Sequence, residues 1–361
     1  MAKVARLAGV SLSTVSRALA GSSSISAQTR ERVKQIATSI NYSIDSSAST
    51  LRTGLTRTIA VVIPLEHASK QRLSDPFFLE MLGGIADELA ARGSSMLLSK
   101  TTQDPREWIS NIIRSRRVDG VIVIGQSLHH AHLNELAADN INMVVWGAKL
   151  PNQRYVTVGS DNREAGYVGT SHLVDQGCRR IVFLGDPAVP EVSARREGYL
   201  HALRTAGIER IPRLELAVRF GSDAAYEAVA ALLNGNADFD GIFACSDVIA
   251  MSAMRALAER GRKIPADVAI VGFDDVPLAA YTNPPLTTLR QDWAAGTRAL
   301  VERVFRPIPG NPVQATVLPT ELVVRGSSLR EHYHRPDAVG AHKGGRAATR
   351  GRQGRTVRGE R

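Results

Sequence analysis

The sequence predicts a small all-α head joined to an α/β body of two doubly wound parallel-sheet lobes. Three observations predict this class. Short amphipathic helices fill the first 43 residues, apolar strands alternate with helices from Thr58 onward, and the pattern restarts at a seam near residues 156–159. The expected segments are a head (1–43), a hinge or linker (44–57), a body (58–330) and a tail (331–361). Within the body, lobe 1 is expected at about 58–157 and 288–318, and lobe 2 at about 158–287 and 319–330.

The head begins with a pattern typical of a helix-turn-helix. Val4, Ala5 and Ala8 predict one short helix, and Gly9 supplies the permissive backbone of a tight turn. A second helix follows, with Ser11 as its N-cap, Val15 and Leu19 on its buried side, and Ser13, Ser16 and Arg17 on its opposite face. The same pattern fits a helical hairpin that caps another domain, so this pattern alone leaves DNA binding open.

A third helix is expected to open at residues 26–29 and to end near Asn41-Tyr42. The segment after it is rich in serine and threonine, which compete with the helix backbone for hydrogen bonds. Two interpretations remain open. The segment is either a flexible linker or a hinge that becomes helical when docked, with Ala48 and Leu51 on one face.

The body contains continuous apolar strands, which are typical of parallel sheets covered by helices on both faces. Short strands at 287–290 and 321–324 suggest that the chain crosses back between the lobes. Ligands of such folds bind at the carboxyl ends of the strands, here in a cleft between lobes. The main strands are expected at 59–63, 96–99, 121–124, 143–146, 181–184, 241–245 and 268–271.

The net charge of +10 is unevenly distributed. Residues 1–58 carry 8 Lys/Arg and 2 acids, residues 331–361 carry 8 and 3, and the middle carries 29 and 30. A basic head on a near-neutral body fits a nucleic-acid module attached to a sensing domain. The tail has no Leu, Ile, Phe or Trp and is expected to be disordered, and a solvated tail is favoured over one that attracts phosphate.

Composition also indicates the compartment. The chain lacks both a signal-peptide core and an apolar run long enough to span a bilayer, so a cytoplasmic protein without membrane contact is expected. The two cysteines, Cys178 and Cys245, lie among apolar neighbours and are interpreted as core residues.

With these residues assembled, the chain resembles the lactose-repressor (LacI) family of bacterial transcription regulators, from about residue 3 to residue 330. The resemblance implies a homodimer, a pseudo-palindromic operator on double-stranded DNA and a cleft like that of type I periplasmic sugar-binding proteins. Its motifs occur in order at 4–17 (V-A-x-x-A-G-V-S-x-x-T-V-S-R), 41–42 (NY), 75–78 (DPFF), 158–162 (VGSDN), 195–199 (R-x-x-G-Y), 272–275 (GFDD), and 285–288 (PLTT) with Gln291.

The resemblance also implies the DNA-contacting residues. Leu12 and Ser13 would open the recognition helix, Arg17 would contact a base or phosphate, and Leu51 would be a wedge inserted from the minor groove. The remaining members of the expected DNA-binding set are Ser11, Thr14, Ser16, Asn41, Tyr42 and Ala48. Two features depart from the family. Only Met1-Ala2-Lys3 precede Val4, which predicts an uncapped first helix or a start further upstream, and Ile44 replaces a frequent proline.

For the effector, the resemblance implies contacts from Arg195 and Asp274. Ser246 occupies a position where relatives often have asparagine, which predicts a shortened or water-mediated contact. Other candidates carry alternatives: Trp146 as a stacking platform or a core residue, Phe77 and Phe78 as cleft lining or as an apolar helix start, Gln126 and Gln291 as rim donors, and Asp161 as a contact or a structural residue at the crossover.

An enzyme is not expected. Asp274 and Asp275 point to opposite sides of a strand, and no nucleophile, base and orienting group appear together. The histidines at 129, 130 and 132 lack the partners of a metal site, and Gly83-Gly84 indicates helix packing rather than a phosphate loop. No cofactor is expected.

The sequence therefore predicts a repressor of carbohydrate-utilisation genes that senses a small sugar. A regulator that needs a nucleobase or another metabolite as corepressor is the alternative. A sugar-binding transport receptor is disfavoured because it would have a signal sequence and no head. The absence of leucine after Leu329 predicts a dimer rather than a tetramer.

Overall fold

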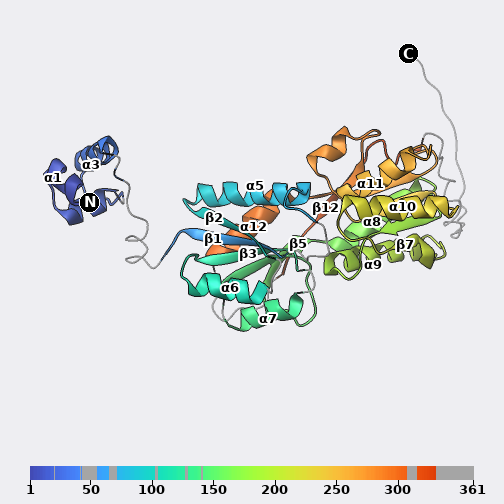
Figure 1. The fold of residues 1–361 in the computed structure, drawn as a ribbon, viewed down its shortest axis with the longest axis horizontal. Helices are drawn as coiled ribbons and strands as arrows, with labels where there is room; N and C mark the ends of the chain where they lie inside the picture. The colour runs from blue at the N-terminus through green and yellow to red at the C-terminus, as the bar shows by residue number, and fades with distance from the viewer. Residues whose placement is uncertain are drawn as a thin grey trace, which may run out of the picture.

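The computed structural model describes residues 1–19, 21–40, 42, 55–64, 71–101, 105–126, 129–139, 141–306 and 315–330 (Figure 1). Asn41, Ala48, Leu51, most of the expected hinge and the expected tail lie outside the described residues. The assignments made for them remain predictions.

The head consists of α1 (Ala2–Ala8), α2 (Leu12–Leu19) and α3 (Ala27–Ser39). Gly9 ends α1 with a φ of 61°, a left-handed conformation that glycine adopts without steric cost. Ser26 caps α3 by accepting a hydrogen bond from the Thr29 amide at 3.2 Å. Small buried side chains of all three helices, including Val4, form one core. The predicted helical head is confirmed.

The first lobe is a six-stranded parallel sheet in the order β11-β5-β4-β3-β1-β2. Figure 1 shows α5 and α12 on one face of this sheet and α6 and α7 on the other. The strands are β1 (Thr58–Pro64), β2 (Ser95–Thr101), β3 (Gly120–Ile124), β4 (Met143–Trp146), β5 (Val156–Ser160) and β11 (Ala315–Leu318), and the helices are α5 (Pro76–Ala91), α6 (Pro105–Arg114), α7 (His130–Ala138) and α12 (Trp293–Phe305).

Strand β1 shows why both faces must be covered. Ile59 and Val61 join the core under α5 and α12, whereas Ala60 and Val62 join the core against α6 and α7. Successive side chains of a strand point to opposite faces, so a continuous apolar run requires two layers of helices.

The second lobe is another six-stranded sheet, in the order β12-β10-β9-β8-β6-β7, with only β12 antiparallel to its neighbour. Helices α10 and α11 cover one face, and α8 and α9 cover the other. The strands are β6 (Ile181–Leu184), β7 (Glu215–Leu216), β8 (Gly241–Ala244), β9 (Ala269–Asp274), β10 (Thr287–Gln291) and β12 (Thr320–Val323). The helices are α8 (Asn162–Asp175), α9 (Pro190–Thr205), α10 (Ser222–Asn234), α11 (Asp247–Ala258) and the short 3-10 turns η2 (Pro212–Leu214) and η3 (Pro277–Tyr281).

The chain passes between the lobes three times: after β5, after β10, and between β11 and β12. The first two crossings follow Ser160 and Gln291, a few residues later than the boundaries expected at 157 and 287. The reason is that β5 and β10 each complete the sheet of the lobe they leave. The two parallel-sheet lobes are those predicted from the alternation of strands and helices.

Helices α8 and α9 approach until their backbones touch. A Cβ added at Gly198 would lie 2.0 Å from the carbonyl oxygen of Arg163, and one at Gly166 would lie 2.0 Å from that of Arg195. Glycine at both positions therefore fixes the distance between the helices, and this contact sets the position of α9, which carries Arg195. Across the described ranges, no helix is both long and apolar enough to cross a membrane.

Candidate functional site

Helix α2 presents the residues predicted to read DNA. The Ser11 hydroxyl accepts a hydrogen bond from the Thr14 amide at 3.1 Å and so caps the helix, as expected of an N-cap serine. Leu12 (52% exposed), Ser13 and Arg17 are exposed, and Thr14 and Ser16 are half-buried. On the other side, Val15 and Ala18 are fully buried against α1 and α3. The exposed face is thus held rigidly by a packed one.

Tyr42 has a different position. Its amide donates to the carbonyl of Ala37 at 2.8 Å, and its ring packs partly against the core of the head. Tyr42 therefore anchors the end of the head, from which the chain leaves towards the expected hinge.

A cavity of about 160 Å³ lies between the two lobes. Its walls come from the carboxyl ends of strands in both lobes, such as Ile124 and Trp146 in the first and Ser246 and Asp274 in the second. This is the position expected for a ligand of paired α/β lobes. Six of the nine predicted effector residues line it, namely Phe77, Phe78, Trp146, Arg195, Ser246 and Asp274.

Arg195 is 6% exposed and held on several sides. Its Nε donates to Asn162 Oδ1 at 2.8 Å, its Nη1 donates to the Cys245 carbonyl at 2.6 Å, and its guanidinium lies 3.5 Å above the centre of the Phe273 ring. Burial lowers the pKa of Arg195, and nearby groups, including Asp274, oppose that shift. The side chain is fixed in position before any ligand binds.

Asp274 ends β9 and is 5% exposed. Its Oδ1 accepts from Gln291 Nε2 at 2.7 Å, and Gln291 Oε1 in turn accepts from the Ser160 hydroxyl at 2.6 Å. Burial raises the pKa of Asp274 well above its ordinary value, the neighbouring carboxylate of Asp247 raises it further, and Arg195 opposes the shift. This chain of hydrogen bonds ties the cavity carboxylate to the ends of β5 and β10, where the chain crosses between lobes.

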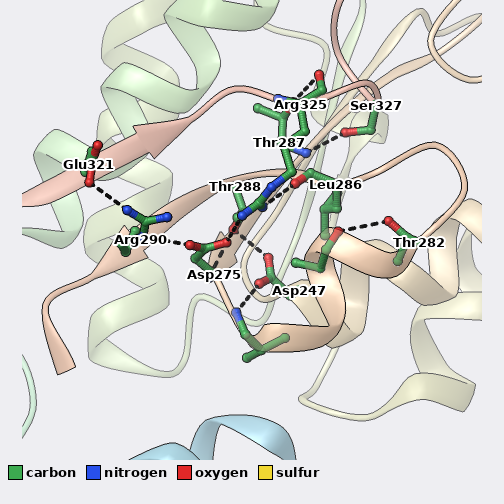
Figure 2. Close-up of polar contacts among 12 residues, drawn as sticks. Asp247, Asp275, Thr282, Leu286, Thr287, Thr288, Arg290, Glu321, Arg325 and Ser327 are labelled. Atoms are coloured by element: carbon green, nitrogen blue, oxygen red, sulfur yellow. Dashed lines mark hydrogen bonds and ion pairs between the residues drawn. The ribbon is translucent and has the colours of Figure 1, made fainter.

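The backbone that aims Asp274 into the cavity is strained. Asp274 has a φ of 121° and Asp275 a φ of 56°, and residues other than glycine rarely adopt positive φ values of this kind. Figure 2 shows what holds this turn. Asp275 Oδ1 accepts from Arg325 Nη2 at 2.6 Å, and its Oδ2 accepts from Arg290 Nε at 2.7 Å.

Asp247 supports the same turn from below. Its two oxygens accept from the Thr288 hydroxyl at 2.6 Å and from the Val276 amide at 2.9 Å (Figure 2). Burial raises the pKa of Asp247. A Cβ at Gly272 would lie 2.3 Å from Asp247 Oδ1, so glycine at that position makes room for the carboxylate.

Three predicted effector residues do not line the cavity. Gln126 is fully buried and donates to the Ala148 carbonyl at 2.7 Å and to the Tyr155 hydroxyl at 3.0 Å. Gln291 is the link between Asp274 and Ser160 described above. Asp161 caps α8 by accepting from the Glu164 amide at 3.0 Å, which is the structural alternative weighed for it.

The aromatic candidates have two roles each. Trp146 is 5% exposed and stacks on Trp293, with ring centres 6.3 Å apart, so it belongs to the core of the first lobe as well as to the cavity wall. Phe77 and Phe78 pack edge to face at 5.2 Å at the start of α5. The three rings therefore belong both to the cavity wall and to the packing of the first lobe, and a ligand-stacking role for Trp146 stays a prediction.

Sequence reasoning missed several lining residues, including Asp75, Glu191, Arg219 and Phe220. Asp75 caps α5 by accepting from the Phe77 amide at 3.0 Å, a role that an aspartate before proline signals. Glu191 lies four residues before Arg195, and residues at that spacing share one helix face. No comparable signal marks Arg219 or Phe220.

The histidines are engaged in the structure. His130 Nδ1 lies 2.7 Å from the Tyr155 hydroxyl, and His129 stacks on His132 with ring centres 6.1 Å apart. Within the described segments, no three His, Cys, Asp or Glu side chains gather as a metal site would require. Cys178 and Cys245 are buried free thiols. Gly84 lies against α12, where a Cβ would meet Thr297 at 2.8 Å, whereas Gly83 faces open space.

Comparison with known proteins agrees with both parts of the chain. Residues 1–45 match the profile of the bacterial regulatory proteins of the lacI family, and residues 170–328 match a periplasmic binding protein-like domain. The transcriptional regulator CelR of Thermobifida fusca is 32% identical over 332 residues, which cover 90% of this chain and 96% of CelR.

Solved structures show the same relationship. A CelR–cellobiose complex is 31% identical with a TM-score of 0.67, covering 90% of this chain and 98% of CelR. The lac repressor dimer bound to operator and the anti-inducer ONPF is 25% identical with a TM-score of 0.78, covering 91% of this chain and 98% of the repressor.

Proposed function

Because the chain belongs to the LacI family of bacterial regulatory proteins, we propose that it represses carbohydrate-utilisation genes as a homodimer on a pseudo-palindromic operator. A small sugar in the interlobe cavity would change its affinity for the operator. The site of action is the cytoplasm, where bacterial operator DNA lies. The related lac repressor has been captured on its operator, which supports the DNA-binding half of the proposal.

The observation that carries the sugar assignment is that Arg195 and Asp274 both line the cavity together with aromatic rings. Carboxylate and guanidinium groups bridge neighbouring hydroxyls, and an aromatic ring packs on the apolar side of a sugar. The cellobiose complex of CelR supports the same class of ligand. A ligand that pulls the lobes together shifts the population of DNA-competent dimers, which is the coupling a regulator needs.

The second lobe carries an exposed surface that suits a second copy. On η3, Tyr281 is 85% exposed and Leu278 is 55% exposed. Large apolar side chains in this state are typical of surfaces that a partner covers. Sedimentation should show a dimer, and Tyr281→Asp should shift the equilibrium towards monomer. An unchanged dimer in this variant would show that the dimer interface does not include Tyr281.

The DNA-binding half is tested with the recognition helix. An operator is first selected with the wild-type protein from a pool of randomised duplexes, and gel shifts are then run at one fixed salt concentration. Arg17→Ala should weaken specific binding by about 1–3 kcal/mol, the range for loss of a base-reading side chain. Lys34→Ala removes an exposed charge from α3 and is the matched control. Equal affinities for wild type and Arg17→Ala would refute the role of this face.

The effector half is tested by calorimetry with a panel of mono- and disaccharides. A binding sugar should lose about 1.5–3 kcal/mol of affinity in Asp274→Asn, the scale of a hydrogen bond to a charged group. Asp223→Asn, an exposed position on α10, is the control. Tight binding of a nucleobase with no sugar binding would instead establish the corepressor alternative.

A further inference from the structure

The inner part of the cavity carries more acidic than basic side chains. Asp75 from the first lobe and Glu191 and Asp274 from the second line it, with Arg195 as the facing cation. The other arginine of the lining, Arg219, is half-exposed, and its Nε lies 3.8 Å from Asp186 Oδ2, so the charges of this pair offset each other. Three carboxylates therefore face one guanidinium.

Arg195 cannot satisfy these carboxylates by direct contact. Two of its nitrogens donate to Asn162 and to the Cys245 carbonyl, and its central carbon lies 3.5 Å from the centre of the Phe273 ring. These contacts direct two of the five N–H donors of Arg195 to neutral groups of the second lobe. Asp75 accepts from protein groups through both oxygens and Asp274 through Oδ1, so the acceptor capacity left for a ligand lies in Glu191 and in the second oxygen of Asp274.

Glu191 provides an independent indication of a missing donor. Its Oε2 is buried and has no hydrogen-bond partner among the described residues. A buried carboxylate oxygen without a donor is costly, because burial removes it from water. Burial accordingly raises the pKa of Glu191, against backbone hydrogen bonds that include those of Gln126 and Ala148 in the first lobe. The carboxylate lies at the boundary of the two lobes, where a bound ligand would lie.

The chemistry of a complementary ligand follows from these groups. A hydroxyl both donates and accepts, whereas an ammonium group carries three donors and no acceptor. The cavity offers an excess of acceptors, and Phe77 and Phe220 line it with aromatic rings, whose faces attract cations. We propose that the effector is an amino sugar, whose protonated primary amine is received by Glu191 and Asp274. This inference rests on the proposed sugar-sensing function and narrows its ligand class.

The experiment compares matched sugars by calorimetry on the full-length protein at pH 7. The pairs are glucosamine with glucose, galactosamine with galactose, mannosamine with mannose, and fully deacetylated chitobiose with cellobiose. At least one amino sugar should bind about tenfold or more tightly than its hydroxyl partner, the size of one charge-assisted hydrogen bond. Its N-acetyl form, which has no charge, should lose that advantage.

Glu191→Gln keeps the size of the side chain and removes its charge. This variant should reduce the preference for the amine, measured as the ratio of the affinities for the amino sugar and its hydroxyl partner, about tenfold. A variant that merely damages the cavity would weaken both partners equally. If Glu191→Gln does not fold, the comparison of amine with N-acetyl sugar on the wild-type protein decides the question.

Each outcome has a distinct meaning. Neutral sugars that bind as tightly as their amino counterparts overturn the amine assignment and leave sugar sensing intact. A panel in which no sugar of either kind binds overturns both. A preference for the amine that persists in Glu191→Gln and in the N-acetyl form overturns the role of the carboxylates.

Discussion

Asp275 is predicted to stabilise the second lobe mainly through Arg325. Its carboxylate is 8% exposed, with Arg325 (18% exposed) on one oxygen and Arg290 (46% exposed) on the other. Asp275→Asn keeps the size of the side chain and its tolerance of a left-handed backbone, but it removes the charge between two guanidinium groups. A hydrogen bond to a charged, largely buried group contributes about 1.5–3 kcal/mol, and an exposed ion pair less than about 1 kcal/mol. The expected loss is therefore about 2–3 kcal/mol.

The measurement is urea unfolding of the full-length protein, followed by circular dichroism. Asp275→Asn should lower the midpoint without changing the slope, Arg325→Met should cost about 2 kcal/mol, and Arg290→Met less than about 1 kcal/mol. Asp275→Ala should cost about 1–2 kcal/mol more than Asp275→Asn, because alanine is strained at a φ of 56°. The reasoning is refuted if Arg290→Met costs as much as Asp275→Asn.

Three further predictions follow from the described contacts. Gly198→Ala should destabilise the protein by about 3 kcal/mol in urea unfolding, because its Cβ would meet a carbonyl oxygen at 2.0 Å, whereas Gly83→Ala, which faces open space in α5, should stabilise it by about 0.5–1 kcal/mol. Burial raises the pKa of Glu191 and of Asp274 in the folded state, so the folded chain binds protons more tightly than the unfolded chain. The free energy of unfolding should therefore fall as pH rises from about 4 towards neutrality, and it should fall less steeply in Glu191→Gln. A rise in the free energy of unfolding over that range, measured by urea titrations, would contradict the assignment. Ser11→Ala should cost about 1 kcal/mol of helix stability, measured as faster hydrogen exchange at the start of α2, and unchanged exchange would show that the cap is dispensable.

The fold could be predicted because its signals are local. The continuous apolar run of β1 requires helices on both faces, and glycine and serine are the residue types that favour the turn at Gly9 and the helix cap at Ser11. The lobe boundaries were harder to predict from the sequence. A strand that ends one lobe and a strand that begins the next have the same composition, so only pairing in the sheet decides that β5 and β10 belong to the lobes they leave.

Residues of the candidate site could be predicted where a sequence motif marks them. They could not be predicted where the direction of a side chain decides whether it faces the cavity. Arg195 and Asp274 line the cavity as the motifs suggested. Gln126 and Gln291 are polar residues at strand ends, yet both turn into the protein and bind other protein groups. Phe220 follows a two-residue strand in an irregular segment, where no periodicity indicates which side chains face the cavity.

The hydrogen-bond chain from Asp274 through Gln291 to Ser160 bears on how relatives of this protein could come to respond to different ligands. If the effector binds at Asp274 as proposed, its signal would reach the two interlobe strands within two hydrogen bonds, with no relay through the lobe cores. Other lining residues, such as Phe77, Glu191 and Phe220, lie outside that chain. We therefore expect substitutions at these positions to change the ligand preference while the hydrogen-bond chain stays intact.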